Sequence, residues 1–354
     1  MEMKSLDIDF TQGCNMACSH CFADAHFRMP NELDTDELKS LLDQASKYEL
    51  SRLSWGLGGE ALTRRDIFEL LEHGKQYGFP QVLITNGLLV TEEVAKRLAA
   101  LGVRVSVSLD GATDATHEKL RILPGSLQKA IRACRRLKAA GVTTGANMTV
   151  TKVNVHEVGA FLDLALELDL DYISMGNILP FGRALERPEL ILDQADFDSV
   201  LEEAKRRAAE GYPIPVYSFD GVLDLVFNAQ RIIERGAFSP RRTSAGRGKV
   251  VVRPDGTVWP CQLLPFPAGN VRDKPLDEIL QSPVFEQVAG FVTEYEEQKS
   301  DCGSGCACSW IMNNERDTIG ANVMDAWKAI QVAVPDALGE KVKAALAARR
   351  QVEA

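Results

Sequence analysis

Residues 13–21 read GCNMACSHC and carry three cysteines, Cys14, Cys18 and Cys21, in a C-x3-C-x2-C spacing. Three thiolates this close together can bind three irons of a [4Fe–4S] cluster and leave the fourth iron without a protein ligand. An iron with an open coordination position can bind and activate a small molecule, so the spacing indicates chemistry rather than electron storage alone. The alternative is a zinc knuckle, although structural zinc sites usually pair their ligands as two C-x2-C units.

A second group of cysteines lies far along the chain. Seven of the eight cysteines fall in two groups, and the second group consists of Cys261, Cys302, Cys306 and Cys308. In a chain without a secretion signal, such groups predict metal ligands rather than disulfides. Four thiolates suffice for one [4Fe–4S] cluster but not for two, and a structural zinc ion is the alternative. Cys134 stands alone and is interpreted as a small packing residue.

The composition excludes several classes of partner. The 354 residues are 45% hydrophobic, which is enough for a large core, and their net charge is −10. An acidic chain is a poor nonspecific binder of nucleic acid or of anionic membranes. No apolar run approaches the roughly 20 residues of a membrane span, and the N-terminus lacks the apolar core of a secretion signal. We therefore expect a cytoplasmic protein with neither a nucleic acid nor a membrane as partner.

The first half of the chain alternates short apolar segments with amphipathic ones. The expected strands are residues 6–10, 50–57, 81–86, 104–110, 144–150 and 172–178, and the expected helices are 36–48, 65–77, 92–101, 127–140 and 155–168. A capping-box pattern at residues 34–37 precedes the first helix. This alternation predicts a parallel sheet whose functional side chains gather at the carboxyl ends of the strands. A closed eight-unit barrel needs about 250 residues, more than this region offers.

The second half of the chain has a different pattern. We expect helices at residues 195–210 and 222–235, with Pro213 and Pro215 breaking the chain between them. Two short strands at 249–253 and 258–259 flank the turn sequence PDGT, which predicts a hairpin. An Ala-rich segment at 325–350 predicts a C-terminal helix.

Glycine-rich and polar motifs follow two of the expected strands. Residues 58–62 read GGEAL after the second strand, and residues 108–111 read SLDG at the end of the fourth. Glycines let a backbone come close to a ligand, and Glu60 offers a carboxylate to an ammonium group. The cysteine triplet after the first strand, followed in sequence by these two motifs, resembles the pattern of the radical S-adenosylmethionine (SAM) superfamily.

This resemblance implies an α/β fold in which the first region is a partial (β/α)6 TIM-like barrel. In the family, SAM chelates the open iron of the [4Fe–4S] cluster, and an electron from the reduced cluster cleaves SAM to methionine and a 5′-deoxyadenosyl radical. The motifs imply a set of SAM-binding residues, with Glu60 toward the amino group, His20 beside the adenine, Arg121 toward the carboxylate and Asn147 toward the ribose: Gly58, Gly59, Glu60, Ser108, Asn147, Arg121 and His20. Ala61 replaces the proline that usually follows Glu60 in this motif, and residues 181–184, FGRA, match a segment of many relatives. No catalytic acid or base emerges from the sequence.

The second cysteine group resembles the SPASM/twitch extension of radical SAM enzymes, a small C-terminal cysteine-rich α+β domain. The resemblance implies one auxiliary [4Fe–4S] cluster on Cys261, Cys302, Cys306 and Cys308. Relatives usually carry a further cysteine before the hairpin, where residues 242–246 here read RTSAG. We expect a barrel over residues 1–185, a helical bridge over 186–240, the auxiliary-cluster domain over 241–324 and a terminal helix over 325–354.

The resemblance implies hydrogen abstraction from an unactivated carbon of a ribosomal peptide or a small natural product. The auxiliary cluster would assist a net oxidation, and a flavodoxin or ferredoxin would supply the electron. The chain begins almost directly at its first strand and leaves no room for a leader-binding domain, which weakens the peptide hypothesis. One alternative is a dehydrogenase, epimerase or decarboxylase of an aminosugar or nucleoside. An alternative of another class is a non-catalytic iron–sulfur carrier or scaffold, which would not need the motifs at Glu60 and Ser108.

Overall fold

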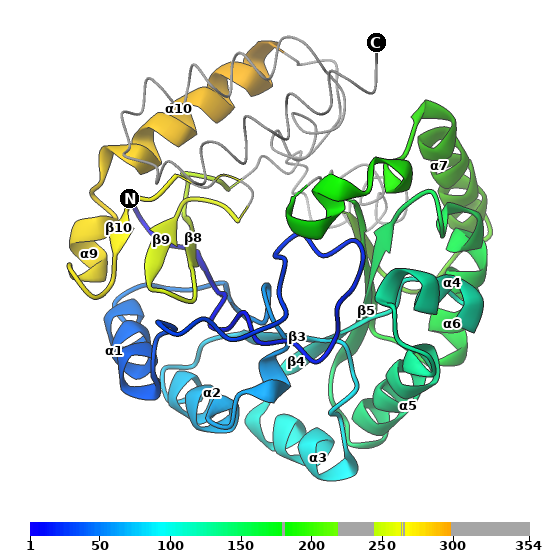
Figure 1. Cartoon of the computed structure of the whole chain (residues 1–354), viewed down its shortest axis with the longest axis horizontal. Helices are drawn as coiled ribbons and strands as arrows, with labels where there is room; N and C mark the ends of the chain where they lie inside the picture. Colours follow the sequence, from blue (N-terminus) through cyan, green and yellow to red (C-terminus); the bar gives the residue numbers. More distant parts are fainter. Residues whose placement is uncertain (179–180, 219–243, 263, 265, 299–354) are drawn as a thin grey trace.

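The computed structural model describes residues 1–178, 181–218, 244–262, 264 and 266–298 (Figure 1). Within them a single ten-stranded sheet runs in the order β10-β9-β8-β1-β2-β3-β4-β5-β6-β7. Strands β1 to β7 are parallel to their neighbours, β8 joins β1 in parallel, and β9 and β10 complete an antiparallel edge. The strands are β1 Ser5–Ile8, β2 Arg52–Trp55, β3 Gln81–Thr85, β4 Arg104–Ser108, β5 Thr144–Val150, β6 Tyr172–Asn177, β7 Val216–Ser218, β8 Lys249–Val252, β9 Thr257–Trp259 and β10 Gly269–Asn270.

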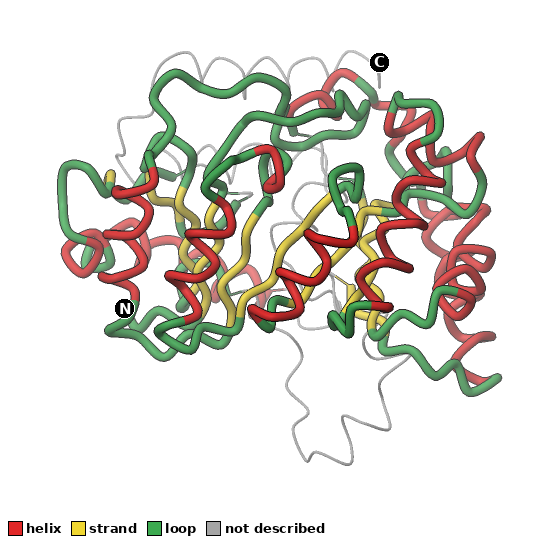
Figure 2. The backbone as a smooth tube through the Cα atoms, turned by 90° about the horizontal axis from the view of Figure 1, so that it is seen from below, coloured by secondary structure: helices red, strands yellow, loops and turns green. Residues whose placement is uncertain are grey.

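Helices cover the outer side of this curved sheet, as Figures 1 and 2 show. They are α1 Thr35–Ala45, α2 Ile67–Lys75, α3 Glu92–Leu101, α4 Asp114–Arg121, α5 Ser126–Ala139, α6 Val158–Glu167, α7 Gln194–Ala209, α9 Leu276–Ile279 and α10 Pro283–Gln298. Short 3-10 turns occur at η1 Ala61–Thr63, η2 Val155–Glu157, η3 Gly182–Glu186 and η4 Pro188–Leu190. The arrangement confirms the predicted partial α/β barrel.

Side chains near the first residue of a helix explain where several helices begin. Asp34 accepts a hydrogen bond from the backbone N–H of Glu37, whose side chain accepts from the backbone N–H of Asp34. This reciprocal pair is the capping box that the sequence predicts before α1. Thr91 and Thr113 cap α3 and α4 in the same way with single bonds. Each cap satisfies an N–H group that the helix itself leaves without a partner.

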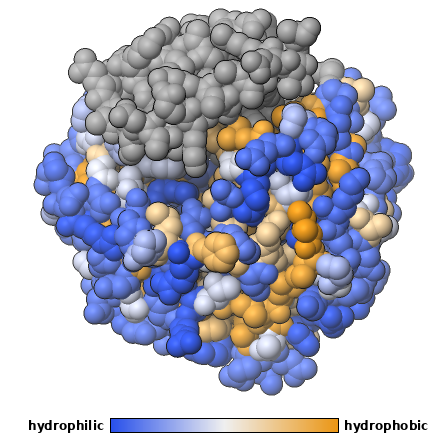
Figure 3. Space-filling model, viewed as in Figure 1, coloured by the Kyte–Doolittle hydropathy of each residue, from blue (hydrophilic) through white to orange (hydrophobic). Residues whose placement is uncertain are grey.

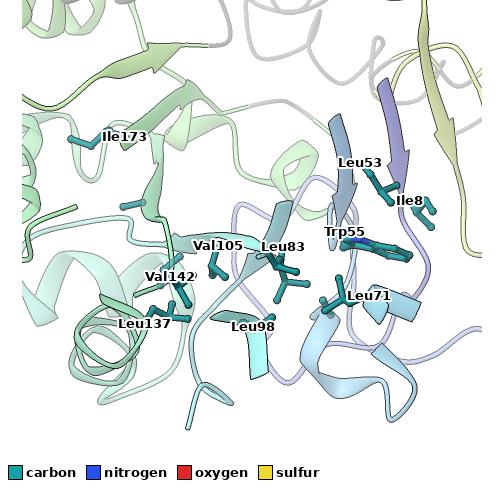
Figure 4. Close-up of a cluster of buried hydrophobic side chains, with 14 of the residues drawn as sticks. Ile8, Leu53, Trp55, Leu71, Leu83, Leu98, Val105, Leu137, Val142 and Ile173 are labelled. Carbon is teal, nitrogen blue, oxygen red and sulfur yellow. The ribbon is translucent and has the colours of Figure 1, made fainter. Parts of the chain in front are cut away.

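The hydrophobic core lies between the outer face of the sheet and the helices (Figure 4). Ile8, Trp55 and Leu83 project from successive strands toward helix residues such as Leu71 and Leu98, which are also fully buried. The Trp55 indole N–H donates to the side-chain oxygen of Gln81 at 2.9 Å, so the largest buried ring has no unsatisfied polar atom. On the face shown in Figure 3, hydrophilic residues dominate the rim and apolar residues gather inside it.

The inner face of the strands carries polar side chains, because neighbours along a strand point to opposite faces. Asp7, Ser54 and Ser106 alternate with core residues and are almost fully buried. Asp7 pairs with Arg52 and with Lys249 at 3.1 Å each. Burial raises the pKa of Asp7, but the two cations outweigh it and leave that pKa below its ordinary value. A charged network inside the barrel therefore joins β1 to β8.

The structure corrects two parts of the sequence-based interpretation. Helix α4 occupies residues 114–121, where the sequence pattern gave no helix, and β7 extends the sheet at residues 216–218, directly after Pro215. Strand β7 has only three residues beside two prolines, too few to show a period-two pattern. The expected helices at 222–235 and 325–350 lie outside the described residues, and the four-part division of the chain stays a prediction. Among the described residues, no helix has the length and apolar character needed to cross a membrane.

Candidate active site

The cysteine triplet lies on the loop that leaves the carboxyl end of β1. The backbone N–H of Cys14 donates to the carbonyl of His26 at 3.0 Å, and that of Cys21 donates to the carbonyl of Cys18 at 3.3 Å. Cys18 is buried, while Cys14 and Cys21 are partly exposed. The loop crosses the open centre of the ring of strands in Figure 1. The predicted position of the triplet at a strand's carboxyl end is therefore correct.

The donor set of this loop suits a cluster better than a single ion. Within residues 1–178 and the other described segments, no three His, Cys, Asp or Glu side chains are grouped closely enough to hold one metal ion. A [4Fe–4S] cluster has its four irons at separate corners of a cube, so the three thiolates that bind it lie at separate positions around it. Burial raises the pKa of the Cys14 thiol to about 11, so its thiolate forms only where a positive group such as iron compensates.

The glycines of the 58–60 motif pack directly against the cysteine loop. The backbone N–H groups of Gly59 and Glu60 donate to the carbonyls of Thr11 and Gly13 at 2.8 and 2.9 Å. A Cβ atom on Gly59 would lie 2.3 Å from the Gly13 carbonyl oxygen, and one on Gly58 would lie 1.7 Å from the Asp9 carboxylate. The sequence suggested that these glycines make room for a ligand. The structure also requires them for close contact with the cysteine loop and with Asp9.

Glu60 connects this motif to the end of β3. Its carboxylate accepts hydrogen bonds from the Thr85 hydroxyl at 2.7 Å, from the Asn86 backbone N–H at 2.7 Å and from the Leu62 backbone N–H at 3.2 Å. Burial nevertheless raises the pKa of Glu60 above its ordinary value. The side chain of Asn86 in turn donates to Asn15 of the cysteine loop at 2.7 Å. Three strand ends are thus joined around the triplet.

Asp110 is the centre of a buried polar cluster beside the triplet. Its Oδ2 atom lies 3.0 Å from Nε2 of His20 and accepts from Nε of Arg121 at 2.5 Å, and its Oδ1 atom accepts from the backbone N–H of Thr149 at 2.8 Å. Burial alone would raise the pKa of Asp110, but the charge of Arg121 and the His20 ring hold it well below its ordinary value. Asp110 is therefore a carboxylate at neutral pH.

Arg121 contacts both the buried Asp110 carboxylate and the cysteine loop. Its guanidinium is bound to Asp110, and its Nη1 atom lies 3.7 Å from the Cys18 sulfur. Ser108 and Asn147 are register partners on β4 and β5, and both are half-buried on the polar face of the sheet. The structure therefore brings Arg121 to the cysteine loop and places Ser108 and Asn147 on the strands that follow.

Two segments of the chain match models of known families. Residues 8–165 match the radical SAM superfamily, and residues 244–308 match the SPASM model, an iron–sulfur cluster-binding domain. The chain is also 31% identical over 313 residues to the AdoMet-dependent heme synthase of Methanosarcina barkeri, with 83% of this chain and 86% of that protein covered. The chain belongs to the radical SAM superfamily. Its SAM and iron–sulfur cofactors and its enzymatic nature are thereby confirmed, which excludes the carrier or scaffold alternative.

Several other proteins resemble this radical SAM enzyme in sequence or in fold. It is 30% identical over 271 residues to the mycofactocin maturase MftC of Mycolicibacterium smegmatis, with 74% of this chain and 66% of that protein covered. Its fold resembles that of anSMEcpe with bound AdoMet, with a TM-score of 0.71, 19% identity and coverage of 96% and 99%. It also resembles Streptococcus suis SuiB bound to the precursor peptide SuiA, with a TM-score of 0.69, 18% identity and coverage of 90% and 76%.

Arg183 of the 181–184 motif fastens the cysteine loop of this radical SAM enzyme. Its guanidinium donates to the carbonyl of Cys18 at 2.8 Å and to that of Ala25 at 3.1 Å, and it pairs with Asp24 at 2.9 Å. The backbone N–H of Arg183 donates to the carbonyl of Cys21 at 3.0 Å. The motif, which follows β6, therefore holds the second and third cysteines of the triplet in place.

Two residues that support the site, His117 and Glu157, were not predicted from the sequence. His117 accepts a hydrogen bond from the backbone N–H of Asp110 at 3.1 Å, and burial lowers its pKa to about 4, so its ring is neutral. Glu157 accepts from the hydroxyl groups of Thr113 and Thr116 at 2.6 and 2.7 Å, as well as from two backbone N–H groups. These partners are separated from Glu157 by about forty residues, so no local pattern reveals them.

The auxiliary site is described only at its first cysteine. Cys261 is buried and follows β9. Its backbone forms an isolated antiparallel β-bridge with Leu264. Lys249 of β8 donates to the Gln262 side chain at 2.9 Å and pairs with Asp7. Cys302, Cys306 and Cys308 lie outside the described residues, so the ligand set of the auxiliary cluster stays a prediction.

Proposed function

We propose that this radical SAM enzyme abstracts a hydrogen atom from an unactivated carbon of its substrate and completes a two-electron oxidation with the help of the auxiliary cluster. SAM and the first cluster, when bound, supply the 5′-deoxyadenosyl radical. One hydrogen atom then leaves the substrate carbon for that radical. One electron leaves for the auxiliary cluster, and the proton released with it goes to solvent or a base.

One observation carries the proposal of net oxidation. Strand β8, which opens the SPASM segment, pairs in parallel with β1, from which the cysteine triplet follows. Asp7 faces Val251 and Ile8 faces Val252 in this register. Two iron–sulfur segments that are far apart in sequence therefore follow adjacent strands of one sheet. Such proximity supports electron transfer from the substrate to the auxiliary cluster.

Within this chemistry we propose the roles of the SAM-binding residues. Gly58 and Gly59 bring Glu60 to the triplet, and the Glu60 carboxylate binds the SAM amino group. Within the described part of the chain, the buried Nδ1 atom of His20 has no hydrogen-bond partner, which suits a side chain turned toward the adenine. Ser108 and Asn147 lie on the polar face of β4 and β5, within reach of the rest of the cofactor. A flavodoxin or ferredoxin supplies the reducing electron.

We propose a porphyrin as the first substrate class. Two relatives that are 30–31% identical over 83–85% of this chain are named AdoMet-dependent heme synthases, and another relative with 28% identity is named Fe-coproporphyrin III synthase. A peptide is the second class, favoured by the four mycofactocin maturases, which are 28–30% identical. Both classes fall within the predicted set of peptides and small natural products.

The test is an anaerobic assay with the reconstituted enzyme, dithionite and SAM. Iron-coproporphyrin III with deuterated side chains is supplied as substrate, and 5′-deoxyadenosine is analysed by mass spectrometry. We expect deuterium in 5′-deoxyadenosine and an oxidised porphyrin. Formation of 5′-deoxyadenosine without deuterium transfer would reject the porphyrin and direct the assay to peptides encoded beside the gene. No 5′-deoxyadenosine under any condition would reject the proposed chemistry itself.

A further inference from the structure

Arg121 is a largely buried arginine that contacts two groups, a carboxylate and a cysteine sulfur. Its Nε atom donates to Asp110 at 2.5 Å, and its Nη1 atom lies 3.7 Å from the sulfur of Cys18, within reach of a long N–H···S hydrogen bond. Only 12% of its side chain is exposed. The charge of Arg121 is stable because the neighbouring carboxylate raises its pKa against the effect of burial. A permanent cation therefore contacts one cysteine of the triplet.

The backbone around Arg121 fixes this contact. Helix α4 ends at Arg121 because Ile122 takes a left-handed conformation with a φ of 53°. The carbonyl of Leu120, one residue earlier, accepts from both the backbone N–H and the hydroxyl of Ser19 at 2.9 and 3.1 Å. Ser19 follows Cys18 directly in the cysteine loop. These hydrogen bonds join the end of α4 to the cysteine loop beside the guanidinium.

Asp110 sets the direction of the guanidinium. Thr149 holds one carboxylate oxygen, and the backbone N–H of Asp110 is bound to His117. With Nε of Arg121 held by the other oxygen, Nη1 is turned to the Cys18 sulfur. Cys18 is thus the triplet cysteine against which the structure places this guanidinium.

We propose that Arg121 tunes the first cluster: it donates an N–H group to the Cys18 sulfur and makes the cluster easier to reduce. Reduction adds one electron, supplied by a low-potential one-electron donor, and the cluster becomes more negative. A cation and a hydrogen bond at a ligand sulfur stabilise the more negative state, so they raise the reduction potential. Asp110 acts as the positioning residue. This inference rests on the radical SAM chemistry proposed above.

The experiment is an EPR-monitored redox titration of the reconstituted full chain without SAM. The first-cluster signal is assigned in a parallel sample as the signal that changes when SAM is added. We compare Arg121→Gln, Arg121→Lys and the wild type, with Arg135→Gln as the matched control. Arg135 is an exposed arginine of α5 that pairs with Glu167. We expect a more negative midpoint for Arg121→Gln, an intermediate value for Arg121→Lys and no shift for Arg135→Gln.

One further measurement, the SAM affinity of the oxidised protein, separates the alternatives. A midpoint equal to the wild type would overturn the proposal, whatever the SAM affinity of the variant. A tenfold loss of SAM affinity together with an unshifted midpoint would make Arg121 a SAM ligand that does not tune the cluster. Because EPR detects only assembled clusters, incomplete loading of a variant does not obscure its midpoint. The titration requires neither SAM cleavage nor substrate, so its failure is distinct from a failure of the proposed oxidation.

Discussion

At the residue scale, most of the motif residues form contacts within the protein that support the cysteine loop. Gly59 and Glu60 form hydrogen bonds to the cysteine loop, and Glu60 also binds the end of β3. Arg183 and Arg121 bind Cys18 from two sides, one at its carbonyl and one at its sulfur. The loop that would carry the cluster is therefore held by side chains and backbone from other strand ends. Such support keeps ligands in place in metal sites.

Replacing Gly59 with alanine is expected to prevent assembly of the first cluster. The new Cβ would lie 2.3 Å from the Gly13 carbonyl oxygen and 2.7 Å from that of Thr11, both backbone atoms that cannot move away alone. Iron analysis of the anaerobically reconstituted variant should show a loss of about half of the bound iron. Gly290→Ala is the control, because a Cβ there meets nothing within 4 Å in helix α10. Full iron loading of Gly59→Ala would contradict the tight packing of the motif.

At the element scale, helix α4 shows how a short polar segment gains its structure. Its sequence, DATHEKLR, has only three buried residues and no extended apolar stripe. Glu157, which follows β5, accepts four hydrogen bonds from Ala112, Thr113 and Thr116 around the first turn of α4. An anion at a helix N-terminus also interacts favourably with the helix dipole. Partners distant in sequence thus make this helix and place Arg121 at its end.

Glu157→Gln is expected to destabilise the protein by about 1–3 kcal/mol at pH 7, because the amide nitrogen cannot accept from the donors around it. In the wild type, burial raises the pKa of Glu157, but the bonds from Thr113, Thr116 and the backbone outweigh it and leave that pKa below 4.5. Its contribution is therefore full above pH 4.5 and declines as the pH falls through the folded-state pKa. Urea unfolding at several pH values should show the difference between variant and wild type shrinking in acid.

The matched control for this prediction is Glu167→Gln on α6. Glu167 is exposed and forms an ion pair with the exposed Arg135, so its replacement should cost less than about 1 kcal/mol. A Glu157 variant that is as stable as the Glu167 variant at pH 7 would show that α4 does not depend on the Glu157 carboxylate.

At the scale of the whole molecule, the sheet unites the two iron–sulfur segments. Strand β8 extends the barrel at β1, and the buried pair of Asp7 and Lys249 reinforces this junction from inside. Gln262, next to Cys261, binds the same lysine. The first cysteine of the auxiliary group is therefore connected to the barrel by strand pairing and by a buried charge network.

Replacing Cys14, Cys18 and Cys21 together with alanine should abolish SAM cleavage and leave the auxiliary site metallated. Cubane stoichiometry predicts about eight irons per chain for the wild type and about four for the triple variant. Iron and zinc analysis with Mössbauer spectra of the anaerobically purified proteins checks both numbers. One zinc and no iron in the triple variant would make the second site structural, because tetrahedral sulfur accepts either metal, and would remove the proposed electron acceptor.

The sequence by itself determined most elements of the barrel and the cysteine motif after β1, although it did not reveal α4 or β7. The six strands from β1 to β6 follow from short apolar runs, and the C-x3-C-x2-C spacing specifies three thiolates for one cluster. The positions of the motifs after β2 and β4 follow as well, because parallel strands share one carboxyl edge. These features are local, since each depends on residues within one turn, one strand or one loop.

Only the tertiary structure decided how these parts meet. Arg121 and Cys18 are 103 positions apart, and the chain has 40 lysine and arginine residues from which such a partner could come. The pairing of β8 with β1 joins segments more than 240 residues apart, and the three residues of β7 carry too little pattern to predict. Sequence periodicity states which face of an element is buried, but not which element covers it. That choice depends on closing the whole sheet, and so the surroundings of the cysteine triplet are a property of the complete fold.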